Sequence, residues 1–375
     1  MKLQILQENL LKAVSLTSRF TSTRAQLPIL GNILLFASKS KLNVSSTNLE
    51  ISASISIGAK VEKDGEVSIP SRILLELISN LPKETLTLEA QKEQLKISTS
   101  SFSSNVLGMN TSDFPKVPSL IHKEKGTLLP TGEFSKALSK VIFASSNDET
   151  RPILTGVLFI FEAGVLNLVS TDGFRLSLNK IKIKDSKLKT RFVLPKNILS
   201  EVGRVEAEGD ILLEVSEKEK QVIFGIGDTV LSSRLLEGEF PDFVKILPKS
   251  SVLKMLVDKE DLLRAVKLSA PFARDNANIV KLTINKDQLI IMAEGSSSGS
   301  QETKIDVKVE SSFAKASEDS EFEIAFSFKF LEDFLGSVDG EEVKMEFSGV
   351  DKPGVFTDPT NPDYLHLIMP VKTQS

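Results

Sequence analysis

Residues 149–159 have the sequence ETRPILTGVLF, and residues 23–36 have the similar sequence TRAQLPILGNILLF. Both contain the triplet Pro-Ile-Leu, which begins at Pro28 and again at Pro152, a separation of 152 − 28 = 124 positions. Further along, Thr47 in STNLE and Thr171 in STDGF are separated by the same 171 − 47 = 124 positions. Self-similarity at a fixed period indicates tandem copies of one structural unit.

A third, weaker copy is present in the last part of the chain. The segment IVKLTI at 279–284 places Leu282 at 282 − 158 = 124 positions beyond Leu158. One third of the 375 residues is 125, so the period and the length agree. We therefore predict three tandem domains, 1–122, 123–249 and 250–375, with linkers at 121–126 and 248–251.

Each third has the same predicted order of elements. An amphipathic helix comes first, at 8–19, 133–143 and 259–268, with Thr131 and Asp258 as candidate N-caps. Alternating strands follow, and a second helix opens on IPSR at 69–72, on LPKN at 194–197 and, with serine replacing proline, in AFSFKF at 325–330. The unit is an α+β domain in which two helices pack on antiparallel sheets of about eight short strands. Polar loops at 295–300 and 311–320 are insertions in the third copy.

Composition narrows the class of protein. Hydrophobic residues at 41% and charged residues at 26% are values of a globular chain. The absence of cysteine excludes disulfides and thiolate metal sites and suits a reducing cytoplasm. The first residues lack the apolar stretch of a signal peptide, and no apolar run approaches the roughly eighteen residues that span a membrane. The net charge of −4 still permits a local basic stripe that binds DNA.

The sequence LNLVSTDGFRLSL at 166–178 predicts a hairpin with an Asp-Gly turn. At the equivalent position the first domain has Leu49-Glu50-Ile51 in place of Gly173-Phe174-Arg175. The hairpin is therefore a shared scaffold, whereas the Gly-Phe-Arg chemistry occurs in the central domain only. Two interpretations stay open: a tight turn and nothing more, or a turn whose side-chain-free Gly173 also leaves space for a ligand.

Four motifs carry a resemblance to a known family: LPILGN at 27–32, TDGFRL at 171–176, EFPDF at 239–243 with Leu247-Pro248, and MPV at 369–371. With the threefold repeat, the whole chain resembles the bacterial DNA polymerase III β subunits, the β sliding clamps. The resemblance implies three copies of the DNA-clamp domain and a head-to-tail homodimer, a six-domain ring with helices inside and sheets outside. Such a ring encircles duplex DNA and tethers the polymerase to it. The resemblance also implies an accessory subunit without a catalytic site, a cofactor or a metal.

Simple geometry supports a dimer rather than a monomer as the ring. Twelve helices, each about 10 Å wide, give a circumference of roughly 120 Å and a hole of about 28 Å. A duplex roughly 20 Å across, with grooves about 8.5 Å deep, passes through that hole with a water layer to spare. Six helices from one chain would leave only about 9 Å.

The resemblance also implies a peptide-docking groove for short linear motifs of the polymerase, the clamp loader and repair factors. Its lining would be Leu154, Thr171, Gly173, Phe174, Arg175, Leu176, Pro241, Lys245, Ile246, Phe330, Leu367, Met369, Pro370, Val371 and Lys372. Leucine, proline, isoleucine and methionine make an adaptable apolar trough, and Arg175 and Lys372 could hold polar or carboxylate groups at its rim. Phe174 departs from the frequent histidine, Phe330 from the common tyrosine, and the tail MPVKTQS from MPMRL. We expect a more apolar groove.

Basic residues recur on the predicted helices of each third, as a phosphate-binding stripe would require. The candidate DNA-facing residues are Lys12, Arg19, Arg24, Arg72, Lys136, Lys140, Arg151, Lys196, Arg204, Arg264 and Lys267. Lys136 and Lys140 are four apart and so share a helical face. Arg24 is included by the family resemblance and Arg151 by the repeat. For any single lysine, a solvated helix face is the alternative.

The resemblance places the dimer surface near Phe102 and in the segment Ala270-Pro271-Phe272, although either phenylalanine could be ordinary core. Two other classes of protein stay open. A hydrolytic or metal site could draw on Asp172, Asp358, Asp363, His122 and His366, which share no motif. A sequence-specific DNA-binding or scaffold protein would have a helix-turn-helix or zinc-finger pattern, which the chain lacks.

Overall fold

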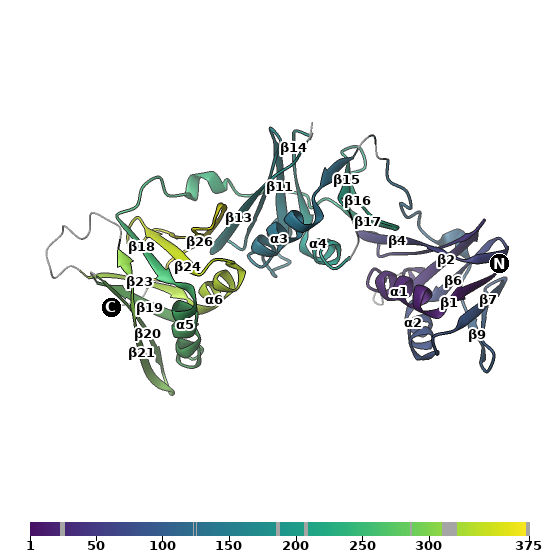
Figure 1. The fold of residues 1–375 in the computed structure, drawn as a ribbon, viewed down its shortest axis with the longest axis horizontal. Helices are drawn as coiled ribbons and strands as arrows, with labels where there is room; N and C mark the ends of the chain where they lie inside the picture. The colour runs from purple at the N-terminus through teal and green to yellow at the C-terminus, as the bar shows by residue number, and fades with distance from the viewer. Residues whose placement is uncertain are drawn as a thin grey trace. The chain divides into compact units, whose positions relative to one another are not determined.

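The computed structural model of the protein describes residues 1–22, 27–122, 124, 126–184, 188–205, 209–285, 287–309 and 321–372 (Figure 1). By compactness the chain divides into two units, Met1–Thr131 with Asn197–Leu235, and Gly132–Lys196 with Leu236–Ser375. The second repeat is thus shared, one part with each neighbour, because its strands continue the sheets of both. Each unit is described by itself.

Among the described residues each repeat contributes two α-helices: α1 (Gln7–Ser18) and α2 (Ser71–Asn80), α3 (Thr131–Ile142) and α4 (Lys196–Val202), α5 (Lys259–Ala273) and α6 (Phe328–Ser337). The predicted first helices are confirmed, although α5 continues beyond 268 and includes Pro271. Asp258 is the N-cap of α5, and its Oδ1 accepts a hydrogen bond from the Asp261 amide at 2.9 Å. Thr131 as an N-cap is wrong: it lies within α3, and its hydroxyl donates to the Gly209 carbonyl.

Unit 1 contains two antiparallel sheets. The five-stranded sheet has the order β5 (Lys60–Lys63), β1 (Lys2–Leu6), β7 (Thr85–Gln91), β8 (Gln94–Ser98), β9 (Ser103–Leu107). The eight-stranded sheet has the order β10 (Thr127–Leu129), β15 (Ile211–Ser216), β16 (Gln221–Ile226), β17 (Thr229–Arg234), β4 (Ile51–Gly58), β3 (Lys41–Thr47), β2 (Asn32–Ser38), β6 (Gly65–Pro70). The pairing of β17 with β4 joins the second repeat to the first.

Unit 2 has the corresponding arrangement. Its nine-stranded sheet has the order β14 (Thr190–Pro195), β11 (Gly156–Glu162), β12 (Val165–Thr171), β13 (Arg175–Lys182), β26 (Asn361–Ile368), β25 (Gly354–Asp358), β24 (Glu342–Phe347), β18 (Leu253–Asp258), β22 (Lys308–Val309). Its four-stranded sheet has the order β21 (Gly299–Asp306), β20 (Gln288–Gly295), β19 (Ile279–Ile284), β23 (Phe322–Ser327). The pairing of β13 with β26 joins the second repeat to the third.

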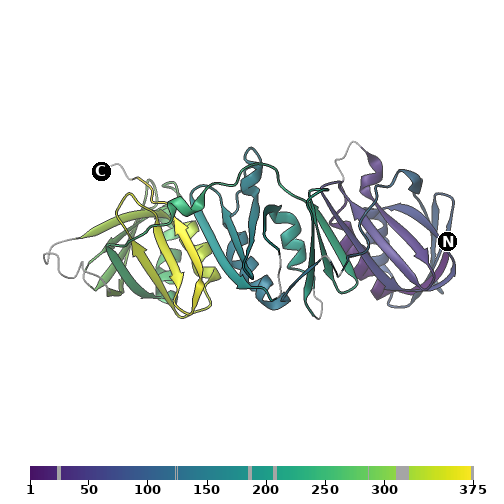
Figure 2. The same cartoon turned by 90° about the horizontal axis from the view of Figure 1, so that it is seen from above.

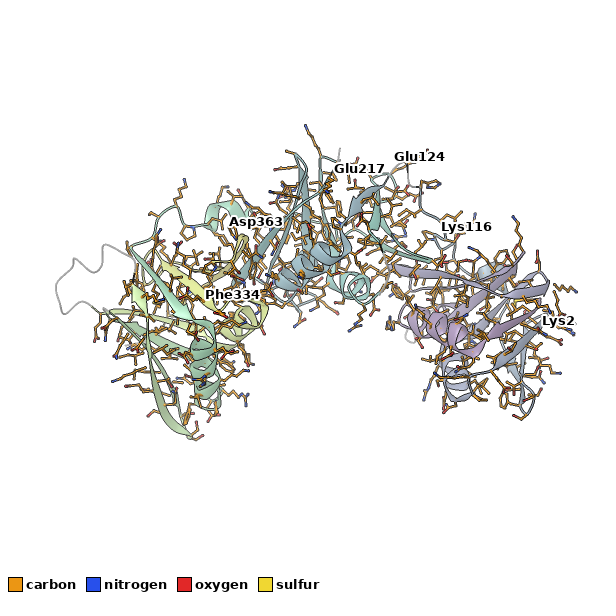
Figure 3. The ribbon with its side chains drawn as sticks, viewed as in Figure 1. Lys2, Lys116, Glu124, Glu217, Phe334 and Asp363 are labelled. Carbon is orange, nitrogen blue, oxygen red and sulfur yellow. The ribbon has the colours of Figure 1, made fainter. Side chains whose placement is uncertain are left out.

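The helices lie against the sheets and close the cores. In unit 1, α1 and α2 pack together, and Leu10 and Val14 are fully buried among strand residues. In unit 2, α5 and α6 lie side by side (Figures 1 and 2), and Phe334 of α6 is fully buried in the third-repeat core (Figure 3). No helix in the described part of the chain is long and apolar enough to cross a membrane.

The predicted domain boundaries fall between elements. Residue 122 lies between the 3₁₀ turn Thr111–Asp113 and β10, and residue 249 lies between the 3₁₀ turn Phe243–Ile246 and β18. The two Pro-Ile-Leu triplets themselves form 3₁₀ turns, Pro28–Gly31 and Pro152–Thr155. Of the polar segments assigned to the third copy, 295–300 covers the end of β20, a three-residue turn at 296–298 and the start of β21, and 311–320 lies outside the described residues.

Candidate functional site

The predicted hairpin is β12 and β13, joined by a turn at 172–174. Thr171 Oγ1 donates to the Arg175 carbonyl at 2.6 Å and accepts from the Gly173 amide at 3.0 Å. Asp172 Oδ1 accepts from the Phe174 and Arg175 amides at 2.9 and 3.0 Å. Gly173 has φ of 95°, a conformation that favours glycine, and a Cβ there would lie 3.2 Å from Arg151 Nη1.

The first repeat builds the same turn with different residues. Thr47 Oγ1 donates to the Ile51 carbonyl and accepts from the Leu49 amide, each at 3.0 Å. Asn48 replaces Asp172 as acceptor of two amides, and Leu49 adopts the left-handed conformation with φ of 77°. The scaffold is therefore shared in atomic detail, whereas the exposed side chains that it carries differ.

The apolar tip of the central-domain turn lies beside the C-terminal tail. Phe174 is 60% exposed and Met369 is 39% exposed, and the Met369 amide donates to the Phe174 carbonyl at 2.8 Å. The Val371 amide donates to the Ala325 carbonyl of β23 at 2.8 Å, which holds the tail against the third repeat. Two large apolar side chains that remain in water thus meet where β13 and β26 pair.

Below this tip three of the predicted groove residues form a buried apolar floor. Leu176 is paired with Leu367 in the β13–β26 register, and both belong with Leu154 to one cluster of buried side chains. Pro241 and Ile246 are exposed on the segment that follows, and Lys245 pairs with Asp242 at 3.0 Å. Pro370 and Val371 are half-buried and Lys372 is exposed. The structure therefore brings Leu154, Leu176 and Leu367 into one cluster and places Met369 beside Phe174.

Arg175, expected to hold polar or carboxylate groups at the rim of the groove, binds such groups of its own chain in this structure. Its side chain is 10% exposed and its guanidinium is fully engaged. Nε donates to Asp172 at 3.0 Å, Nη1 to Asp333 at 2.5 Å, and Nη2 to the Phe143 carbonyl at 2.7 Å. The rings of Phe330 and Phe143 lie 4.5 and 5.5 Å from the guanidinium carbon. Arg175 thus joins the central hairpin to α6 and to the end of α3.

A buried polar cluster continues behind this joint. Ser177 Oγ lies 2.6 Å from Nδ1 of fully buried His366, whose ring stacks on Phe334 at 5.3 Å. Burial lowers the pKa of His366 to about 3, with the Arg175 charge acting in the same direction. Burial also raises the pKa of Tyr364, which shares a 2.6 Å hydrogen bond with Ser337. These residues were not predicted as part of the site, because their partners come from distant parts of the chain.

The candidate DNA-facing residues fall into several groups. Within the described residues, four are exposed and form no ion pair: Lys12, Arg72, Lys136 and Lys267. Four more carry a carboxylate partner: Arg19 and Arg204 pair with Glu201, Arg151 with Asp148, and Arg264 with Asp261. The Lys196 amine donates to Asn147. Arg24 lies outside the described residues.

Lys140 is a correction to the predicted stripe. Its side chain is only 5% exposed, its Nζ lies 2.8 Å from Asp339, and it lies over the Tyr364 ring at 5.3 Å. Helical spacing placed Lys140 on the same face as Lys136, which is exposed. Asp339 and Tyr364 of the third repeat cover Lys140, so this lysine does not face solvent in unit 2.

The edge strands of the two units bear on the surface that the sequence assigns to the dimer. In unit 1, β4 is covered by β17, and its residues Ile51–Ile55 are all buried. In unit 2, β21 holds the equivalent place in the third repeat but is the edge of its sheet, and its first five residues are exposed or half-buried. The strand β9, which corresponds to β17, is likewise an edge of its sheet in unit 1. Phe102 precedes β9 and is half-buried; Pro271 is exposed, and Phe272 packs on the third-repeat core.

The residues of the rival hydrolytic site have structural partners. Asp358 is buried, yet hydrogen bonds from Thr360 and from the Gly340 and Asp339 amides outweigh burial and lower its pKa. Asp172 caps the hairpin turn, Asp363 is exposed on the exterior (Figure 3), and His366 is buried against phenylalanines. In unit 1, His122 lies 3.5 Å from Glu214. Among the described residues no group of three acidic or histidine side chains could hold a metal ion.

Three α+β repeats whose sheets continue from one repeat into the next define the DNA-clamp class of fold. Family models agree with this: residues 1–118, 128–242 and 244–372 match the N-terminal, central and C-terminal domains of the DNA polymerase III β subunit. The chain belongs to this family, the β sliding clamps, which are non-catalytic accessory subunits.

Individual relatives match over the whole length. The β sliding clamp of Bacillus subtilis is 29% identical over 384 residues, with complete coverage of both chains. The crystal structure of the DNA polymerase sliding clamp from Bacillus subtilis superposes with a TM-score of 0.93 at 26% identity and complete coverage of both chains. The β sliding clamp of C. crescentus has a TM-score of 0.90 at 25% identity, covering 100% of this chain and 99% of that one.

Proposed function

We propose that this chain acts as a head-to-tail homodimer, a closed ring of six domains that encircles duplex DNA and tethers a polymerase to it in the cytoplasm. The observation that carries the proposal is the unused pair of sheet edges. Two junctions between consecutive repeats are made by strand pairing, β4 with β17 and β13 with β26. A closed ring needs one further junction, between the third repeat of one subunit and the first repeat of the other. The equivalent strands for that junction are β21 and β9, each of which is paired on one side only in the part of the chain that the structure describes.

The repeat also supplies the register of that pairing. In unit 1, Ser54 lies opposite Val230. Glu302 is the equivalent of Ser54 in the third repeat, because it lies two periods of 124 further along the chain. Ser103 is the equivalent of Val230 in the first repeat: Ser103 pairs with Ser98 in the β8–β9 hairpin, and Val230 pairs with Gly225 in the β16–β17 hairpin. In the dimer, Ser103 should therefore lie opposite Glu302 of the partner subunit. The side chains of both residues are exposed in the single chain.

Cysteine crosslinking tests the register directly, because the chain contains no cysteine. Opposed residues of antiparallel strands have Cα atoms about 4.5–5.5 Å apart, within the range of a disulfide. The variant with Ser103→Cys and Glu302→Cys should form a covalent dimer under mild oxidation. The matched control, Ser103→Cys with Thr303→Cys, should not, because a one-residue slip turns the side chain to the other face of the sheet. A protein that remains monomeric at micromolar concentration by light scattering would contradict the ring.

DNA contact in this proposal is electrostatic and independent of base sequence. Lys12, Arg72, Lys136 and Lys267, which are exposed and have no ion-pair partner among the residues that the structure describes, are suited to phosphates. Binding of a short linear duplex should be weak and should fall steeply with salt, because each phosphate contact releases a counterion. Retention on DNA would come from topology rather than affinity. Tight binding of one defined sequence at high salt would favour a sequence-specific DNA-binding protein instead.

We further propose that the exposed Phe174 and Met369, with the buried Leu176 and Leu367 beneath them, mark a docking groove for short linear peptides. Its support is the pairing of a buried apolar floor with exposed apolar side chains, which otherwise remain in water. Polymerase, clamp loader and repair factors would compete for it. Phe174 makes its tip more apolar than histidine would.

The test of the groove replaces Met369, Pro370 and Val371 by alanine. Affinity for partner peptides should be lost while the dimer mass is retained. An alanine triple at 350–352, an exposed stretch before β25, is the matched control and should bind peptides normally. Unchanged peptide affinity in the tail variant would contradict the assignment.

A further inference from the structure

The apolar floor of the proposed groove does not end at Leu176. Along β13, the residues Leu176, Leu178 and Lys180 alternate onto one face of the sheet, opposite Thr171, Val169 and Asn167 of β12. Leu176 and Leu178 belong to the same buried cluster, together with Leu158 of β11. One continuous face thus extends from the β13–β26 junction across the sheet of the central domain.

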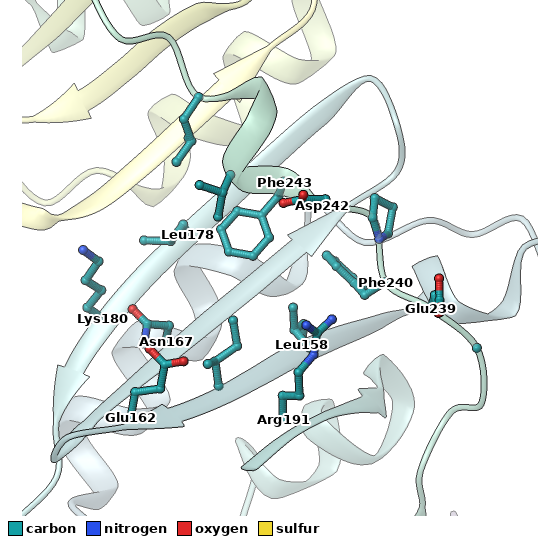
Figure 4. A pocket seen from close by; sticks show the side chains of 15 residues that line it. Leu158, Glu162, Asn167, Leu178, Lys180, Arg191, Glu239, Phe240, Asp242 and Phe243 are labelled. Atoms are coloured by element: carbon teal, nitrogen blue, oxygen red, sulfur yellow. The ribbon is translucent and has the colours of Figure 1, made fainter. Parts of the chain in front are cut away.

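This face forms the floor of a cavity of about 860 Å³ (Figure 4). Leu158, Ile160 and Leu178 line it from the sheet, and residues 238–244 with Leu247 form the opposite wall. Pro241 of that wall is also a predicted groove residue, so the cavity and the groove adjoin. Its size is within the roughly 300–1,000 Å³ of sites that bind small organic groups.

The wall offers apolar side chains that the fold does not bury. Val244 is 63% exposed and Phe243 is half-buried, whereas Phe240 behind them is buried at 5% exposure. Phe243 packs partly against the apolar floor, whereas Val244 faces solvent beside it. A further apolar side chain in the cavity would cover the exposed surface of both.

The charged residues that line the cavity are of both signs, so they do not favour a ligand of either charge. Lys180, Arg191, Glu162 and Glu239 all line the cavity (Figure 4). All four are exposed. Asp242 is already paired with Lys245. The apolar floor and wall therefore decide what the cavity accepts.

We propose that this cavity is an extension of the docking groove that binds an apolar side chain flanking the core motif of the same linear peptide. The inference rests on the proposed docking function. Leu176, Leu178 and Lys180 follow one another at every second residue of β13, so successive side chains on this face are about 7 Å apart. An extended peptide advances about 3.3 Å per residue, so the second anchor lies about two to four residues from the one that occupies the groove.

The probe is a library of displayed random 16-residue peptides, selected on the full-length dimer. Selected peptides should carry two apolar anchors at this spacing. Their affinity is then measured by fluorescence anisotropy for the full peptide and for one shortened to the groove-binding anchor. Burial of one large apolar side chain predicts a difference of about ten- to a hundredfold.

Two variants separate the cavity from the groove. Val244→Glu, at an exposed position, should reduce the affinity of the full peptide to that of the shortened one and leave the shortened one unchanged. Val350→Glu, 57% exposed and not part of either surface, is the control and should bind both peptides normally. The tail variant with alanine at 369–371 should lose both peptides.

Selected peptides with a single anchor, or equal loss of both peptides in Val244→Glu, would overturn the extension and leave the groove intact. Full binding of the shortened peptide by the tail variant would overturn the groove itself.

Discussion

Replacing Arg175 by methionine tests whether this residue joins the two domains of unit 2 or simply contacts peptides. Methionine fills part of the same space but removes all three donors. Asp172 Oδ2, on a side chain that is 15% exposed, and the Phe143 carbonyl would each lose the donor that Arg175 supplies. Breaking a buried pair on one side costs about 3–5 kcal/mol, whereas the Asp333 pair, with a 45% exposed carboxylate, contributes about 0–1 kcal/mol. We expect a local loss of about 3 kcal/mol.

Hydrogen exchange measures this loss where it occurs. Since 1.36 kcal/mol corresponds to a factor of ten, amides of β13 and α6 should exchange roughly a hundredfold faster in Arg175→Met. The β-strands of unit 1 serve as the internal control and should not change. Arg175→Lys should give an intermediate effect, because lysine keeps the charge but cannot donate to three partners in one plane. Lost peptide binding with unchanged exchange would refute the structural role and make Arg175 a direct peptide contact.

Three further predictions concern the buried histidine His366, the lysines of helix α3 and the groove tip Phe174. Burial holds the pKa of His366 at about 3, so below about pH 6.5 the unfolded chain binds a proton that the folded chain does not. The free energy of unfolding therefore decreases by about 1.4 kcal/mol for each pH unit by which the pH is lowered below that value. Between pH 7.5 and 5.0, urea unfolding should thus show wild type losing about 2 kcal/mol more than His366→Asn; an equal loss would be contrary to this. Lys136→Glu should lower the slope of DNA affinity against salt by about one phosphate contact, whereas Lys140→Met should not; a matching effect of both would restore Lys140 to the stripe. Phe174→Ala should weaken groove peptides by about ten- to a hundredfold in anisotropy titrations, and no change would remove Phe174 from the groove.

Local pattern and the internal repeat predicted much of this fold. The separation of Pro28 and Pro152 indicated tandem domains, because equivalent turns need equivalent residues, and both triplets form 3₁₀ turns. The turn at Asp172 was predictable since its hydrogen bonds are made within a few residues. Asp258 as an N-cap was predictable for the same reason.

The errors occur at residues whose exposure and partners are determined by contacts with distant parts of the chain. Helical spacing placed Lys140 on a polar face, but Asp339 and Tyr364, from a different repeat, cover it. The sequence around Arg175 does not reveal that Asp333 and Phe143 occupy its guanidinium. Charge and exposure of a side chain near a domain junction thus depend on residues that a local pattern cannot show. The cavity under 238–247 escaped prediction because its floor and its wall come from separate segments.

The central claim is that the protein holds DNA by encircling it. The most direct measurement loads the protein onto nicked circular DNA, linearises the circle with a restriction enzyme, and follows protein retention at moderate salt. A topological ring should remain on the circle and leave through the ends after cutting, and blocking both ends with a bound protein should restore retention. Retention on the open linear DNA, equal to that on the circle, would contradict the account and indicate binding by affinity.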